Sequence, residues 1–157
     1  MLKLLKSLIG TADKAPQKQS IRVATDFEPV GLIWYSDTEM PLPVWESMTV
    51  AIGEDWSRER RDAFCTAAAG QWLLALCSTL PAGYRIHESD DFLLLSALED
   101  RPAHVLLRFC QSARRRIVGN LGDAATARDD GKHVVLVFDD DQTYYDYIAH
   151  YYPEGGE

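Results

Sequence analysis

The apolar positions of the chain change between helical and strand-like spacing several times, and these changes predict its elements. Four-residue spacing over residues 57–80 predicts a long core helix. Its buried stripe is expected to be Phe64, Ala68, Trp72, Leu76 and Leu80. Asp100 and Pro102 favour the start of a second long helix that ends before Gly122. Its buried stripe is expected to be Leu106, Phe109, Ala113, Ile117 and Leu121.

Short runs of aliphatic, β-branched and aromatic residues predict about five strands. Residues 21–25 and 32–36 flank a segment with Pro and Gly, and we expect them to pair as a hairpin. Residues 84–88 and 92–96 flank a polar turn in the same way. The uninterrupted apolar run at residues 133–138 is typical of a central strand covered on both faces.

The order of these elements predicts an α/β fold (mixed α+β) in a single domain with three to four helices. Strand, helix and strand over residues 92–138 form a βαβ unit, and residues 141–152 add a helix after an aspartate N-cap. Residues 37–56 are expected to form an irregular packed loop. Residues 1–20 are expected to be an N-terminal arm and linker. Residues 21–157 then form the single domain, either finished or truncated at its C-terminus.

The charge balance narrows the classes of partner. The chain of 157 residues has a formal net charge of −8, and such an acidic protein repels phosphate backbones, so nucleic acid is not an expected partner. No stretch approaches the roughly 20 apolar residues that cross a bilayer, so no membrane span is expected. The arm, with Leu2, Leu5 and Ile9 on one side, is expected to dock on its own domain or to fray, in preference to binding a membrane surface.

The cysteines indicate a reducing compartment. Cys65, Cys77 and Cys110 are odd in number, widely spaced and set in apolar runs, which favours buried thiols over a disulfide framework. A cytoplasmic location is therefore expected. The oligomeric state is not indicated by any of these features.

Fragments of catalytic motifs are present, but none is complete. His87 and Glu88 begin a zinc-helix motif, yet Asp91 replaces the second His and the segment is strand-like. The Asp139 to Asp141 cluster follows a strand, where a hard cation would find oxygen ligands, although helix capping is the commoner role of such residues. We therefore assign no catalytic, cofactor-binding or metal-binding residue, and no cofactor.

Residues 92–156 resemble, in outline, the segment that precedes the zinc helix in gluzincin-like metallopeptidases. The resemblance rests on a strand like residues 92–96, a helix that ends near Leu121 and Gly122, a strand like residues 133–138, and an aromatic helix. The chain has no HExxH helix, so no catalytic residue is carried over.

The resemblance implies a non-catalytic accessory or N-terminal domain of a metallopeptidase-like protein, with its own downstream region as the partner. The first alternative is a stand-alone protein–protein interaction module that uses an aromatic surface, centred on the tyrosine-rich helix at residues 144–152. The second alternative is a small enzyme with an acidic cation site at residues 139–141.

Overall fold

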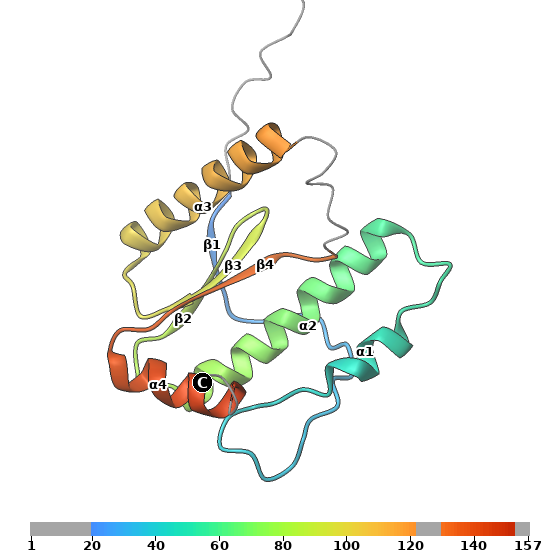
Figure 1. The fold of residues 1–157 in the computed structure, drawn as a ribbon, viewed down its shortest axis with the longest axis horizontal. Helices are drawn as coiled ribbons and strands as arrows, with labels where there is room; N and C mark the ends of the chain where they lie inside the picture. The colour runs from blue at the N-terminus through green and yellow to red at the C-terminus, as the bar shows by residue number, and fades with distance from the viewer. Residues whose placement is uncertain (1–19, 122–129, 153–157) are drawn as a thin grey trace, which may run out of the picture.

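The computed structural model describes residues 20–121 and 130–152, which fold into four strands and four helices (Figure 1). The strands are β1 (Arg22–Ala24), β2 (Arg85–Glu88), β3 (Phe92–Ser96) and β4 (His133–Val137). The helices are α1 (Trp45–Ala51), α2 (Arg58–Thr79), α3 (Asp100–Leu121) and α4 (Asp141–Tyr151). The predicted mixed α/β fold is confirmed, with four strands in the described residues instead of about five.

The strands form one sheet in the order β1-β2-β3-β4. The β1–β2 and β2–β3 pairs are antiparallel, whereas β3 and β4 are parallel and joined through α3, as the predicted βαβ unit requires. The prediction that β4 is central is wrong, because β4 is the last strand of the sheet that the described residues form. Its apolar run is explained by the two faces of the sheet: Val134 and Leu136 pack on one hydrophobic cluster, and Val135 and Val137 pack on the other.

The predicted N-terminal hairpin is also wrong. Residues 22–24 pair with β2, where Val23 lies opposite His87, and residues 32–36 contribute only an isolated bridge between Trp34 and Pro43. β1 therefore pairs with the edge of β2 and not with the nearer residues 32–36. Within the segment predicted as irregular, Trp45–Ala51 forms the short helix α1.

Helices cover both faces of the sheet (Figure 1). One cluster lies between the sheet and α2 with α4. Its buried members are Ala24, Leu73, Leu76, Tyr84, Ile86, Leu93, Leu95 and Tyr147. The other cluster lies under α3. Its buried members are Phe92, Leu94, Ala103 and Leu107. No helix in the described part of the chain is long and apolar enough to cross a membrane.

Small residues let other segments approach α2 closely. The Phe27 ring packs directly over Gly70, and Gly131, with φ of 86°, lies against the backbone at Cys65. The predicted buried stripe of α2 is only partly buried. Ala68 and Leu76 are in the core, whereas Phe64, Trp72 and Leu80 are half-buried.

Candidate functional site

One side of α3 departs from the predicted burial pattern. The sequence predicts that Phe109, Ile117 and Leu121 are buried, but their exposed fractions are 67%, 56% and 55%. Val105, one turn before Phe109, is also exposed. We call this row of residues the outer stripe; its four-residue spacing winds it around the helix by about 160° from Val105 to Leu121. Its members, at four-residue spacing, are Val105, Phe109, Ala113, Ile117 and Leu121.

A different stripe of α3 faces the sheet. Ala103, Leu107 and Gln111, also four residues apart, are buried and lie against the strands. The small Ala103 allows close packing, whereas Gln111 is buried with no hydrogen-bond partner for its side-chain amide among the described residues. The helix thus carries apolar residues on two sides, and periodicity alone cannot decide which side faces the sheet.

The first half of the outer stripe lines an open apolar groove. The groove has a volume of about 550 Å³. The lining residues are Arg101, Pro102, Val105, Leu106 and Phe109. Its walls are almost entirely apolar apart from the arginine, so it suits an aliphatic or aromatic side chain better than a polar ligand.

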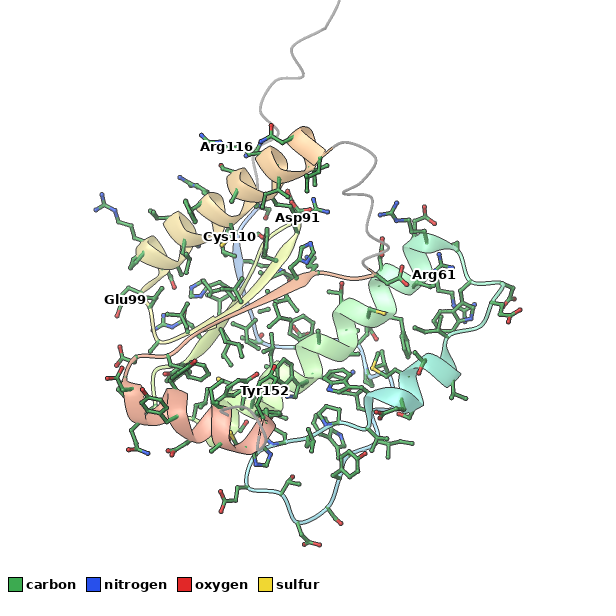
Figure 2. The ribbon with its side chains drawn as sticks, in the orientation of Figure 1. Arg61, Asp91, Glu99, Cys110, Arg116 and Tyr152 are labelled. Carbon is green, nitrogen blue, oxygen red and sulfur yellow. The ribbon has the colours of Figure 1, made fainter. Side chains whose placement is uncertain are left out.

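Arginines border the first half of the outer stripe. Arg101, Arg108 and Arg115 recur every seven residues, which places them along one side of a helix, and all three are exposed. Arg116 is exposed as well, and Figure 2 shows it near the far end of α3. Arg114 differs, because its Nε donates to Nε2 of His133 at 3.1 Å. Arg114 therefore points toward the sheet, whereas Arg115 and Arg116 are exposed. The three consecutive arginines do not form one phosphate-binding row.

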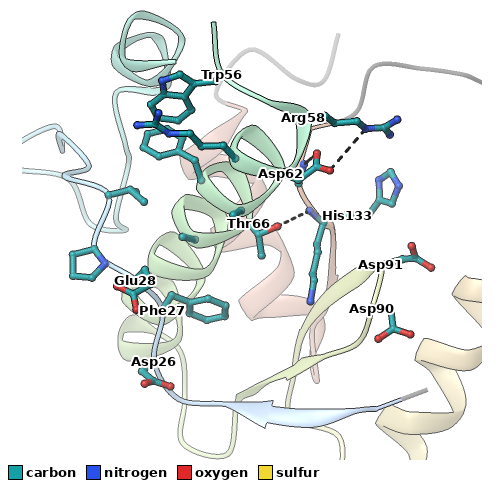
Figure 3. Close-up of a pocket in the computed structure, with 18 of the residues that line it drawn as sticks. Asp26, Phe27, Glu28, Trp56, Arg58, Asp62, Thr66, Asp90, Asp91 and His133 are labelled. Atoms are coloured by element: carbon teal, nitrogen blue, oxygen red, sulfur yellow. Dashed lines mark hydrogen bonds and ion pairs between the residues drawn. The ribbon is translucent and has the colours of Figure 1, made fainter. Parts of the chain in front are cut away.

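A second concave feature lies between the first turns of α2 and the β2–β3 turn. It is a cavity of about 1110 Å³, and Figure 3 shows Asp62 and Thr66 on the α2 side with Asp90 and Asp91 across from them. The backbone N–H of Lys132 donates to Oγ1 of Thr66 at 3.1 Å, which ties the start of β4 to α2.

The charged side chains of this cavity already have partners. Glu88, behind the wall, lies 2.5 Å from a guanidinium nitrogen of Arg22 and 2.7 Å from Nζ of Lys132. Burial alone would raise the pKa of Glu88, but the hydrogen bonds and charges of Lys132 and Arg22 outweigh it and hold that pKa below its ordinary value. The described cations that line the cavity each have an acidic or aromatic partner: Arg22, Arg58, Arg60, Arg114 and Lys132. Among the described residues, the cavity therefore offers an anion no unpaired Arg or Lys side chain.

The side chains of the incomplete zinc motif do not lie around one point. His87 is fully buried under α3, where its Nε2 lies 3.1 Å from Oδ1 of Asp100 and its ring is edge-on to His104. The His87 hydrogen bond lowers the pKa of the exposed Asp100 carboxyl. Asp91, at the other end of the motif, instead faces Arg114 at 3.5 Å.

The aspartate cluster before α4 divides its roles. Asp140 is the N-cap: its Oδ1 accepts from the backbone N–H of Thr143 at 2.8 Å, and its Oδ2 accepts from Oγ1 of the same residue at 2.8 Å. Asp139 and Asp141 are exposed. Among the described residues, no three His, Cys, Asp or Glu side chains are close enough to share a metal ion.

The tyrosines of α4 face both inward and outward. Tyr147 is in the core, and burial raises its pKa to about 12. The Tyr151 hydroxyl donates to the carbonyl of Pro41 at 2.6 Å and accepts from Nε1 of Trp72. Tyr144 and Tyr145 are exposed, as is Tyr152 at the end of the helix (Figure 2). The rings of Tyr144 and Tyr145 lie 5.5 Å apart and form a small exposed aromatic surface.

The comparisons with known proteins add no relative. No protein-family model, curated protein or solved structure matches the chain. The resemblance to gluzincin-like metallopeptidases therefore stays a prediction.

The outer stripe is the feature that sequence reasoning missed. The signal was available in the seven-residue recurrence of Arg101, Arg108 and Arg115 beside the apolar positions. Such a basic border is typical of a helix side that faces solvent or a partner, not of one that faces a sheet.

Proposed function

We propose that this chain is a non-catalytic protein-binding domain whose partner lays an amphipathic helix along the outer stripe of α3. The observation that carries this proposal is the exposure of Val105, Phe109, Ile117 and Leu121 on a single helix. A helix with apolar residues on two sides is normally covered on both. Contiguous exposed apolar surface of this kind marks an interaction site more often than an unused face.

The borders of the outer stripe define the chemistry of the partner. Arg101 and Arg108 flank its Val105–Phe109 half, so a partner helix with acidic residues next to its apolar side would match both its shape and its charge there. The groove at Phe109 would receive one apolar side chain of that helix, in the manner of helix-in-groove recognition.

The same surface chemistry would also suit an anionic membrane, because basic amphipathic helices bind such surfaces. The net charge of −8 disfavours this reading, since the rest of the molecule is repelled by anionic lipid. The protein partner is therefore the reading we adopt, and the membrane is an outcome of the test.

The gluzincin-like resemblance suggests one source for the partner helix. In a metallopeptidase-like parent, that helix would belong to the downstream region of the same polypeptide, and the chain would be an accessory domain without peptidase activity of its own. A separate partner protein would use the same surface, so the experiment below tests the shared binding chemistry.

The test uses a labelled synthetic helix with leucines along one side and glutamates on both borders. Fluorescence anisotropy compares it with a scrambled peptide of the same composition. We expect saturable binding that weakens with salt, and we expect Phe109→Ser to weaken it by about tenfold or more, as loss of a central apolar anchor does. Tyr145→Ser, which also removes an exposed aromatic ring, is the matched control and should leave binding unchanged.

Each alternative outcome has a defined meaning. Equal binding of the designed and scrambled peptides would refute the proposal. Loss of binding in Tyr145→Ser but not in Phe109→Ser would transfer the function to the aromatic surface of α4. Binding to anionic phosphatidylserine vesicles without binding to the peptide would replace the protein partner by a membrane.

A further inference from the structure

Among the described residues, no strand lies beside the outer edge of β4. β4 has five residues, His133–Val137, with no Pro, Gly, Asp, Glu, Lys or Arg within it. The opposite edge of the sheet, β1, has only three residues and begins with Arg22. Exposed edges are usually shortened, charged or interrupted, because an unpaired row of N–H and C=O groups recruits another strand. β1 follows this rule and β4 does not.

The register shows which backbone groups of β4 are available. The His133 N–H donates to the Asp91 carbonyl at 3.0 Å, so His133, Val135 and Val137 direct their backbone groups toward β3. Val134 and Leu136 therefore direct theirs away from the sheet. No hydrogen bond to these outward groups occurs between the described residues.

We propose that two copies of this chain join through their β4 edges, antiparallel to one another, to form one continuous sheet. The pairing is centred on Val135, because only that register matches all five residues of one β4 with all five of the other. Val134 of one copy then lies opposite Leu136 of the second copy, and the two exchange both backbone hydrogen bonds. The inference uses different residues from the proposed function and does not depend on it.

A second copy fits this edge for two reasons. The pairing is self-complementary about a two-fold axis, the commonest symmetry of soluble oligomers. The backbone groups also match: the outward groups of Val134 and Leu136 in one copy meet those of Leu136 and Val134 in the other. The apolar faces stay aligned, since Val135 of each copy remains on the α3 side of the joined sheet.

Engineered cysteines test the register. In a background with Cys65, Cys77 and Cys110 changed to Ala, Val135→Cys would place two thiols at a non-hydrogen-bonded antiparallel pair, where the Cα atoms are about 4.5 Å apart and a disulfide can form. We expect a covalent dimer on a non-reducing gel after mild oxidation. Val134→Cys is the matched control, because its thiol lies opposite Leu136 and on the other face, and it should remain monomeric on the gel.

Sedimentation velocity tests the assembly itself. We expect the wild-type chain to dimerise with increasing concentration. Leu136→Pro removes an outward N–H and leaves the bonds to β3 in place, so it should give a monomer with unchanged circular dichroism. Phe109→Ser should leave the dimer intact, which separates this interface from the outer stripe.

The outcomes decide the proposal even if Leu136→Pro does not fold. Equal cross-linking of Val135→Cys and Val134→Cys, or a wild-type monomer throughout a concentration series, would overturn it. Dissociation by Phe109→Ser would assign the dimer to α3 instead. A synthetic peptide of residues 132–138 should compete with dimerisation, and a dimer that the peptide leaves unchanged would place the interface elsewhere.

Discussion

The two long helices, α2 and α3, span 22 residues each but are covered very differently. α2 lies between the sheet and further layers of chain: the Trp72 ring is edge-on to Trp45 on one side and to Tyr151 on the other, and Phe27 packs over Gly70. α3 covers the opposite face of the sheet, and the side chains of its outer stripe are exposed.

This difference suggests that α2 contributes more to the stability of the fold and that α3 carries the proposed binding surface. α2 contributes five residues to the buried interior, whereas α3 contributes three, of which one is the polar Gln111. Apolar burial scales with the free energy of folding, so the α2 side should supply more of it. The apolar surface of α3 that the fold does not use is then available for a partner.

The largest expected difference comes from truncating one large side chain on each helix. Leu73→Ala in α2 removes a fully buried side chain and should lower the free energy of unfolding by about 3 kcal/mol. Phe109→Ala in α3 removes a larger but exposed side chain and should change it by less than about 0.5 kcal/mol. Urea unfolding of both variants measures the two values. A cost for Phe109→Ala that approaches the Leu73→Ala value would show that the outer stripe is already covered within the chain.

Adding one methyl group to each helix should shift stability in opposite directions. A Cβ at Gly70 would collide with the Phe27 ring, so Gly70→Ala should cost about 1–3 kcal/mol through overpacking. A Cβ at Gly119 of α3 meets no atom of the described residues within 4 Å. Gly119→Ala should therefore stabilise the protein by up to about 1 kcal/mol through helix propensity. Thermal unfolding of the pair distinguishes them, and stabilisation by Gly70→Ala would contradict the packing described here.

The smallest difference concerns two acidic groups on opposite faces of the sheet. The pKa of Glu88, on the α2 side, is lowered from 4.5, so its ion pairs stabilise the fold at higher pH and are lost as pH falls through the lowered value. Glu88→Gln should be less stable than wild type at neutral pH, with the gap closing in acid. Asp100, at the start of α3, also has a lowered pKa, but it is exposed and screened. Asp100→Asn should therefore reduce the pH dependence of the free energy of unfolding less than Glu88→Gln does. The reverse order in acid titrations followed by fluorescence would contradict this prediction.

Sequence periodicity predicted the elements whose determinants are local. α2, the β2–β3 hairpin, the β3–α3–β4 unit and α4 all occur where apolar spacing, the start signal of Asp100 and Pro102 and the aspartate cap placed them. These signals depend on neighbours in the sequence, so they need no knowledge of the tertiary fold.

Pairings between distant segments were not predictable in the same way. β1 pairs with β2 across α1 and α2, and nothing in residues 21–25 distinguishes that partner from the nearer residues 32–36. An apolar run such as β4 indicates that both faces of a strand are covered, but it does not indicate whether another strand lies on each side of it in the sheet. Predicting the outer stripe would also have required knowledge of the tertiary fold. The sheet packs against only one of the two apolar sides of α3, and this choice decides which residues of the helix are buried.

The pairing of β1 with β2 also has a consequence for the order of events during synthesis. β1 is made early, but its partner begins at Arg85. Translation at about 5–20 residues per second therefore leaves roughly 60 residues, or several seconds, between the appearance of the two strands. The remaining strands and their helices follow β2 consecutively and can assemble as they emerge. β1 therefore waits for β2 to be made, and Val23 and its neighbours spend that interval without their native hydrogen bonds.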